Sequence, residues 1–156
     1  QVLLSGGGQA AGQFGGPGWE ALTGDFDGNG VSDPALYHEL SGEWLVSTAG
    51  GLLQGILGGP GWEALTGDFD GDGITDAAVY HGASGSWLIY LVGTEELLSA
   101  QLGGPDYRPL TGEFDGDGVW DIGAYRTDGC WFLTAVDGRE ILWHWAWGGP
   151  QWRPGL

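Results

Sequence analysis

The sequence predicts an all-β fold, and three observations support this prediction. Apolar segments are short and flanked by Gly, Pro, Asp and Ser, as is typical of strands joined by turns. No stretch of about ten residues has helical apolar spacing without an interrupting glycine. The tripeptide Gly-Gly-Pro recurs with its prolines 43, 45 and 45 residues apart, so the strands belong to an internal repeat.

Each repeat contains four predicted strands. In the first repeat we expect them at residues 20–24, 34–38, 43–47 and 52–57, and later repeats match, for example at 77–81 and 86–92. Repeats of about 40 to 50 residues with four strands each are typical of β-propeller blades, because a single blade cannot bury both of its faces alone. The predicted architecture is therefore a β-propeller.

Residues 1–156 are predicted to form one propeller domain, which the repeat boundaries divide into three full repeats and two partial ones. Residues 18–60, 61–105 and 106–150 are three full repeats. Residues 1–17 match the outer two strands of a blade, and residues 151–156 match the start of a first strand. We expect the two ends to form a composite blade, which gives about four blades per chain, or a larger ring completed by a homo-oligomer.

Charge and cysteine content exclude several classes of protein. The chain has 21 acidic residues against four arginines and no lysine, a formal net charge of −17 that would repel nucleic acids and anionic lipids. No apolar run is long enough for a transmembrane helix, and no signal sequence is visible, so we expect no membrane insertion. The single cysteine, Cys130, excludes an intrachain disulfide, and its alignment with Glu43 and Ser86 predicts a position near the surface.

Three nine-residue loops, at 25–33, 68–76 and 113–121, hold more than half of the acidic residues. Such clustering without basic neighbours is repulsive unless a cation neutralises it, and oxygen atoms at alternating positions suit Ca²⁺ better than zinc or magnesium. We expect about three Ca²⁺ per chain. Positions 1, 3, 5 and 9 of each loop would supply side-chain oxygens, and position 7 would supply its backbone carbonyl. The predicted ligands are Asp25, Asp27, Asn29, Val31 and Asp33 in the first loop; Asp68, Asp70, Asp72, Ile74 and Asp76 in the second; and Glu113, Asp115, Asp117, Val119 and Asp121 in the third.

An EF-hand is the rival interpretation of these loops. It requires a bidentate Glu at position 12 and flanking helices. Position 12 is Leu36, Val79 and Ala124 in the three loops, and a predicted strand follows each loop directly. The sequence therefore favours a loop that is closed by the Asp at position 9.

The chain resembles the FG-GAP repeat family, also called VCBS or integrin-α-like repeats. The resemblance rests on Phe-Gly-Gly-Pro at 14–17, on the Asp-Phe-Asp-Gly-Asn/Asp-Gly loops and on the Asp-x-Ala-Val-Tyr strand that follows, and it covers nearly the whole chain. It implies calcium-binding propeller blades of the kind found in extracellular adhesion proteins and lectins. Propellers of that family usually have seven blades, whereas this chain encodes three and a composite fourth.

Repeated aromatic residues have two interpretations. Trp44, Trp87 and Trp131 share one repeat position, and we expect them to pack between blades; aromatic rings between blades could instead line sugar pockets. A second group, Trp143, Trp145 and Trp147, alternates along a predicted outer strand, which predicts one tryptophan-rich face for a ligand or an oligomer contact.

These features predict a calcium-stabilised binding module, secreted or on the cell surface, that binds carbohydrate as a lectin does or serves in cell adhesion. Its partner would be a glycan or a surface protein. No nucleophile, metalloprotease or phosphate-binding motif is present, so we expect no enzyme. The alternative is a structural, self-assembling propeller fragment, or an engineered repeat protein, with no small ligand.

Overall fold

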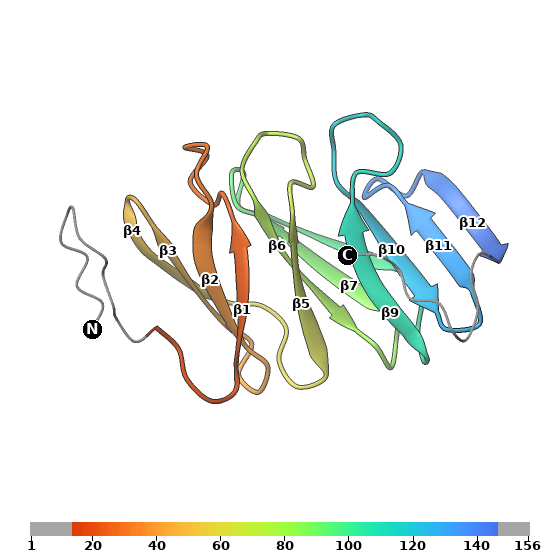
Figure 1. The fold of residues 1–156 in the computed structure, drawn as a ribbon, viewed down its shortest axis with the longest axis horizontal. Helices are drawn as coiled ribbons and strands as arrows, with labels where there is room; N and C mark the ends of the chain where they lie inside the picture. The colour runs from red at the N-terminus through yellow and green to blue at the C-terminus, as the bar shows by residue number, and fades with distance from the viewer. Residues whose placement is uncertain (1–13, 147–156) are drawn as a thin grey trace.

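The computed structural model describes residues 14–146, with residues 142–146 described by their backbone alone. Three four-stranded antiparallel sheets make up this part of the chain, each from four consecutive strands (Figure 1). The first sheet contains β1 (Trp19–Gly24), β2 (Asp33–His38), β3 (Glu43–Thr48) and β4 (Gly51–Ile56). The second contains β5 (Trp62–Gly67), β6 (Asp76–His81), β7 (Ser86–Leu91) and β8 (Glu96–Gln101). The third contains β9 (Tyr107–Gly112), β10 (Asp121–Arg126), β11 (Cys130–Thr134) and β12 (Glu140–Ala146).

The all-β prediction is confirmed for the described residues, which contain no helix. It follows that no described segment is a helix long and apolar enough to cross a bilayer. The strands predicted from the sequence agree with those of the structure to within one residue at each end, as for 43–47 against Glu43–Thr48. Short apolar runs bounded by Gly, Asp and Ser were therefore sufficient to locate them.

The sheets stand in a row, and the first strand of each contacts the first strand of the next (Figure 1). Threonines of the repeated Leu-Thr-Gly segment link them: the hydroxyl of Thr66 donates to the carbonyl oxygen of Thr23 at 3.3 Å, and that of Thr111 donates to the carbonyl oxygen of Thr66 at 3.0 Å. The row does not close into a ring within residues 14–146. The predicted composite blade depends on residues 1–13 and 147–156, which lie outside the described residues.

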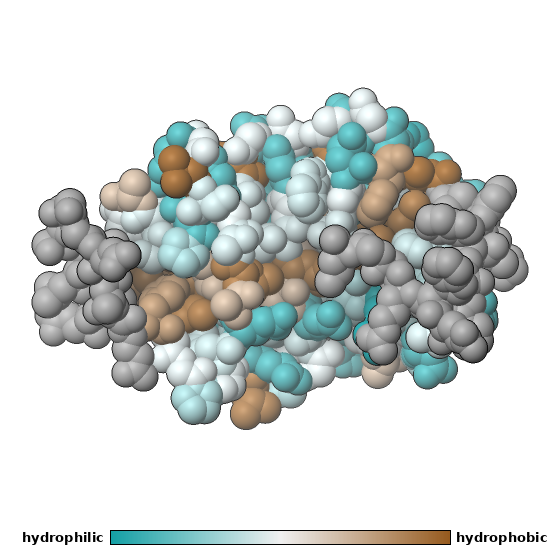
Figure 2. Space-filling view, viewed as in Figure 1, coloured by the Kyte–Doolittle hydropathy of each residue, from teal (hydrophilic) through white to brown (hydrophobic). Residues whose placement is uncertain are grey.

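The hydrophobic core lies between successive sheets. Tyr37 and Trp44 of the first sheet pack with Val79 of the second, while Trp87 of the second belongs to a cluster with Ile122 of the third. The second strands of the second and third sheets are buried along their first five residues. Apolar residues also form a band across the middle of the face over β1 and β5, whereas the loop end is mostly hydrophilic (Figure 2).

Two of the three repeated tryptophans confirm the packing prediction. Trp44 and Trp87 are 5% and 0% exposed, and Trp131 is half-buried. Each of the two buried indoles contacts the tyrosine ring of the neighbouring second strand and donates its N–H to a carbonyl oxygen near the next Gly-Gly-Pro, that of Leu57 or Leu102. The tryptophans therefore bury the sheet face and also fix the start of the following repeat.

Tyrosine explains the recurrence of Gly-Gly-Pro. The hydroxyl of Tyr80 accepts a 2.9 Å hydrogen bond from the amide of Gly104 and donates to its carbonyl oxygen at 3.2 Å. Tyr37 makes the same pair of contacts with Gly59. Because the preceding glycine has a φ near +85° and faces the tyrosine closely, a side chain at that position would be strained and crowded.

The expected surface position of Cys130 is wrong. Its side chain is only 5% exposed, and its thiol is not in a disulfide. The hydroxyl of Tyr107 lies 3.7 Å from its sulfur. The aligned residues Glu43 and Ser86 are only half-buried, so repeat alignment located the strand correctly but not the local depth of this side chain.

Candidate metal centres

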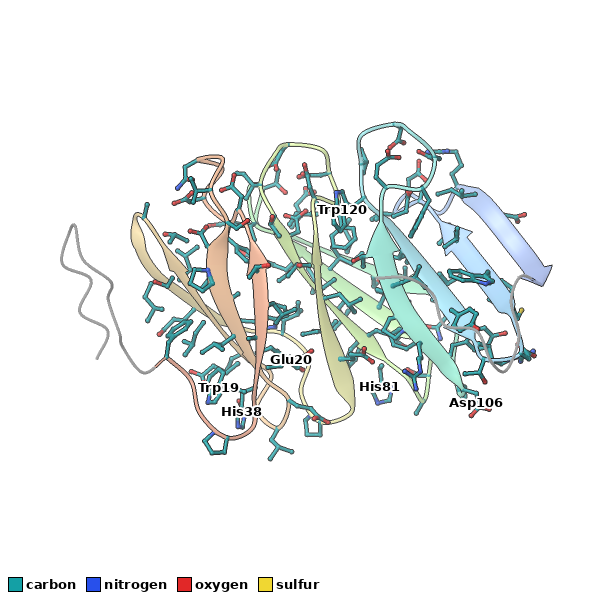
Figure 3. The ribbon with its side chains drawn as sticks, viewed as in Figure 1. Trp19, Glu20, His38, His81, Asp106 and Trp120 are labelled. Atoms are coloured by element: carbon teal, nitrogen blue, oxygen red, sulfur yellow. The ribbon has the colours of Figure 1, made fainter. Side chains whose placement is uncertain are left out.

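The three acidic loops lie at the same end of each sheet, along one edge of the row, and each joins the first and second strand of its sheet (Figure 3). Each loop gathers three carboxylates whose oxygen atoms lie within 4.8 Å of one another. These residues occupy positions 1, 3 and 9, and the groups are Asp25, Asp27 and Asp33; Asp68, Asp70 and Asp76; and Glu113, Asp115 and Asp121. The donor set is oxygen alone, which suits a hard divalent cation.

The carboxylate at position 9 is buried in every loop, with Asp76 and Asp121 fully enclosed and Asp33 5% exposed. It begins the second strand, and one of its oxygens accepts the backbone amide of the phenylalanine at position 2; for Asp76 the donor is Phe69, at 2.8 Å. Burial raises the pKa of Asp76 to about 7, even though hydrogen bonds from the amides of Val92 and Phe69 oppose that rise. A buried carboxylate beside two others would be stabilised in its charged form by a cation.

Asp121 differs from the other two position-9 carboxylates in having a buried oxygen atom without a hydrogen-bond partner. Its Oδ2 accepts the amide of Phe114 at 2.8 Å, but its Oδ1 is buried and has no hydrogen-bond partner. Burial raises the pKa of Asp121, and the nearby Asp115 adds to the rise. An unpartnered buried carboxylate oxygen is unfavourable, so a cation at this position would satisfy it.

The side chain at position 1 shapes the loop. In the first loop, Asp25 accepts the amides of Asn29 and Gly30 at 3.0 and 2.7 Å, and Asp68 accepts those of Asp72 and Gly73 in the second loop at 3.1 and 2.9 Å. The glycine at position 6 has a positive φ of 85° or 86° in these two loops, which a side chain rarely adopts. The loop is thereby curled around its first carboxylate.

The predicted ligands at positions 5 and 7 are not part of these three carboxylate groups. Asp72 and Asp117 lie outside the groups of close carboxylates. At position 5, one side-chain oxygen accepts the amide of position 7, at 2.8 Å for both Asn29 with Val31 and Asp72 with Ile74, and at 2.9 Å for Asp117 with Val119. The proposed carbonyl ligands at position 7, from Val31, Ile74 and Val119, stay predictions.

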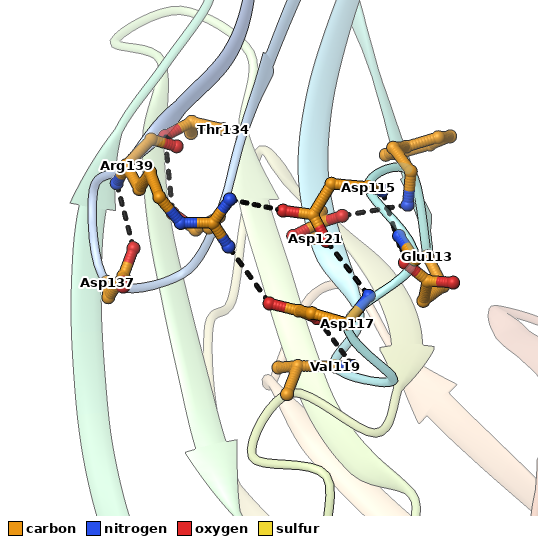
Figure 4. A network of polar contacts seen from close by, with 11 residues as sticks. Glu113, Asp115, Asp117, Val119, Asp121, Thr134, Asp137 and Arg139 are labelled. Atoms are coloured by element: carbon orange, nitrogen blue, oxygen red, sulfur yellow. Dashed lines mark hydrogen bonds and ion pairs between the residues drawn. The ribbon is translucent and has the colours of Figure 1, made fainter.

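The third loop differs from the others in two ways. Position 1 is Glu113, whose Oε1 accepts the amides of Asp115 and Gly116, earlier in the loop than the amides bound by Asp25. In addition, Arg139 reaches it from the turn between β11 and β12, with Nη1 2.5 Å from Oδ2 of Asp115 and Nη2 2.9 Å from Oδ2 of Asp117 (Figure 4). Sequence reasoning missed Arg139, because it lies 18 positions after the last residue of the loop.

A hollow of about 310 Å³ lies between the first and second sheets. Its lining includes Trp62 and Tyr80 together with Glu20, Glu39 and Glu63. Glu20 and the adjacent Trp19 lie toward the end opposite the acidic loops (Figure 3). Burial raises the pKa of both Glu20 and Glu63, with a further contribution from Glu39 and from Glu20 respectively. The hollow thus combines an aromatic surface with hydrogen-bond acceptors.

The predicted tryptophan face falls largely outside the described residues. The side chains of Trp143 and Trp145 and all of Trp147 are not described. The backbone of β12 pairs Trp143 with Phe132 and Trp145 with Trp131, and the register shifts between these two pairs. A register shift of this kind interrupts the alternation of side chains along a strand, and the shared face of these tryptophans stays a prediction.

Comparison of the chain with models of protein families, with curated proteins and with solved structures finds no match.

Proposed function

We propose that the chain is a calcium-stabilised β-propeller module of extracellular type and has no enzymatic activity. The observation that carries this proposal is the threefold recurrence of an oxygen-only cluster with a buried carboxylate at position 9. Three four-stranded sheets in a row, each beginning with the strand that contacts its neighbour, are consistent with consecutive blades. In this proposal the composite blade of the two termini, or further chains, would complete the ring.

Calcium would link the first two strands of each sheet. It would join positions 1 and 3, at the end of the first strand, to position 9, which is the first residue of the second strand. It would also remove the repulsion among carboxylates in a chain with a net charge of −17. Sites of extracellular modules bind Ca²⁺ with a Kd of roughly 10⁻⁴ to 10⁻³ M, so sites of this type would be occupied where calcium is millimolar.

Chelation tests this function. At a free Ca²⁺ concentration ten times the Kd, each occupied site adds about 1.4 kcal/mol to the free energy of unfolding. For a chain of this size, three sites correspond to a rise in melting temperature of roughly 10 °C or more. We expect the melting temperature to fall by that amount in excess EDTA and to recover with Ca²⁺. An unchanged melting temperature would reject the calcium sites.

A lectin-like role has one specific observation in its favour, which is the hollow beside Trp62. An indole ring suits the apolar face of a sugar ring, and the carboxylates of Glu20 and Glu63 are acceptors for sugar hydroxyl groups. Glycan-array binding in Ca²⁺ tests this role, with Trp62→Ala as the site variant and Trp120→Ala, at the loop end, as the control. Binding that survives Trp62→Ala would exclude this hollow as the sugar site.

Self-association is the second candidate function. All six residues of β4 are exposed, among them Leu52, Leu53 and Ile56, so this strand, which is at the edge of its sheet among the described strands, presents apolar side chains. Light scattering in millimolar Ca²⁺ separates the two roles. A mass of 16.4 kDa favours a self-contained module with a ligand, whereas a multiple of that mass favours assembly.

A further inference from the structure

We propose that Arg139 is an internal counter-ion of the third acidic loop and competes there with the metal ion, so that this loop binds Ca²⁺ more weakly than the other two. The inference rests on the proposed function, namely that the loops bind calcium. Arg139 itself lies outside the third acidic loop, in the turn between β11 and β12 of the same sheet.

The guanidinium group contacts two of the predicted ligands of this loop. Its Nη1 lies 2.5 Å from Asp115, at position 3, and its Nη2 lies 2.9 Å from Asp117, at position 5 (Figure 4). These contacts use oxygens that a Ca²⁺ ion would otherwise draw on. A Ca²⁺ ion bound by the same carboxylates would also repel the positively charged guanidinium group.

The turn holds the backbone of Arg139 in place. Its amide donates to Oδ1 of Asp137 at 2.8 Å, and its carbonyl oxygen accepts the amide of Ala135 at 2.9 Å and the hydroxyl of Thr134 at 3.0 Å. The side chain therefore starts from a fixed point beside the loop, which lowers the entropic cost of forming its two ion pairs.

Within residues 14–141, whose side chains the structure describes, no basic side chain pairs with the first two loops. The chain has no lysine and no arginine before Arg108. At the corresponding turns a neutral backbone amide reaches the acidic residues instead: Ala49 donates to Asp27 at 3.2 Å, and Val92 donates to Asp76 at 2.8 Å. These loops gain hydrogen bonds from the turn, but their negative charge is left for a metal ion to neutralise.

Arg139 does not complete the third loop. Oδ1 of Asp121 keeps no hydrogen-bond partner although Arg139 is engaged nearby. The side chain of Arg139 is about half exposed, so it can leave the loop for solvent. The arrangement therefore favours competition, in which Ca²⁺ displaces Arg139 at a higher concentration than the other loops require, over permanent replacement of the metal ion.

The test uses calorimetric Ca²⁺ titration of the full chain and of Arg139→Gln, with Arg126→Gln as the matched control. Arg126 pairs with Asp128 through a 2.6 Å contact on an exposed surface, so its loss removes an equal charge without touching an acidic loop. We expect the weakest site of the unmodified chain to gain roughly three- to tenfold in affinity in Arg139→Gln, a range that reflects the modest strength of exposed ion pairs. Arg126→Gln should leave it unchanged.

A second variant assigns the gain to the third loop. Adding Asp115→Asn to Arg139→Gln should cancel the gain, while the two tighter sites persist. Three sites of equal affinity that do not respond to Arg139→Gln would overturn the role of Arg139 and leave the proposed function intact. Absence of Ca²⁺ binding in every variant, including at the first two loops, would overturn both.

Discussion

Thr75 and Asp25 join the first two acidic loops by a reciprocal pair of hydrogen bonds. The amide of Thr75 donates to the carbonyl oxygen of Asp25 at 2.7 Å, and the amide of Asp25 donates to Oγ1 of Thr75 at 2.9 Å. The next pair of loops repeats the first of these bonds, because the amide of Trp120 donates to the carbonyl oxygen of Asp68 at 2.8 Å. Position 8 of one loop thus anchors position 1 of the preceding loop.

Thr75→Val should destabilise the protein by about 1 to 2 kcal/mol, because it keeps the shape of the side chain but leaves the part-buried amide of Asp25 without its acceptor. Urea denaturation measures the change. Thr75→Ser, which retains the hydroxyl group, is the control. Equal losses for the two variants would show that the hydroxyl contributes nothing.

Tyr80→Phe should cost about 1 to 3 kcal/mol, since both the amide and the carbonyl group of Gly104 would lose a buried partner. Tyr90→Phe changes the same chemical group at a side chain that is 36% exposed and should be nearly neutral. The melting temperatures of Tyr80→Phe and Tyr90→Phe, measured in Ca²⁺, check this prediction. The account of Gly-Gly-Pro would fail if the two variants melted at the same temperature.

Gly58→Ala should be destabilising by at least about 1 to 2 kcal/mol, the usual cost of a left-handed conformation for a residue with a side chain. Gly58 has a φ of +86°, and an added Cβ would lie 2.8 Å from the hydroxyl oxygen of Tyr37. Gly16→Ala is the control, because a Cβ there would meet nothing within 4 Å. Denaturant midpoints of the two variants check the prediction, and similar midpoints would contradict it.

The stability of the metal-free protein should decrease as the pH rises from about 4 to 7. Burial raises the pKa of Asp76 to about 7, above the ordinary value of 3.8, so the folded chain holds this proton more tightly than the unfolded chain. The resulting stability is complete below pH 3.8 and is lost as the pH approaches 7. Calcium favours the charged carboxylate and should reverse the slope.

Melting temperatures across this pH range, after removal of divalent ions and again in Ca²⁺, measure that dependence. Asp76→Asn should reduce the slope in the metal-free protein, and Asp128→Asn, at an exposed site, should not. A metal-free melting temperature that increases with pH would contradict the assignment.

Sequence reasoning located the strands and the acidic loops because both depend on local patterns, namely short apolar runs and carboxylates at alternating positions. It predicted ligands at positions 1, 3, 5, 7 and 9, and the structure brings the carboxylates of positions 1, 3 and 9 together in all three loops. Arg139 and the bond between Thr75 and Asp25 could not be predicted, since each joins segments that only the packing of strands and sheets makes neighbours. The depth of Cys130 likewise depends on packing around Tyr107 rather than on its place in the repeat.

Titration of the metal-free chain with Ca²⁺ measures directly whether the acidic loops bind calcium. We expect saturable binding of at least two ions per chain with a Kd of roughly 10⁻⁴ to 10⁻³ M, and loss of one tight site in each of the variants Asp27→Asn and Asp70→Asn. No binding at millimolar Ca²⁺, or binding unaffected by both variants, would contradict it.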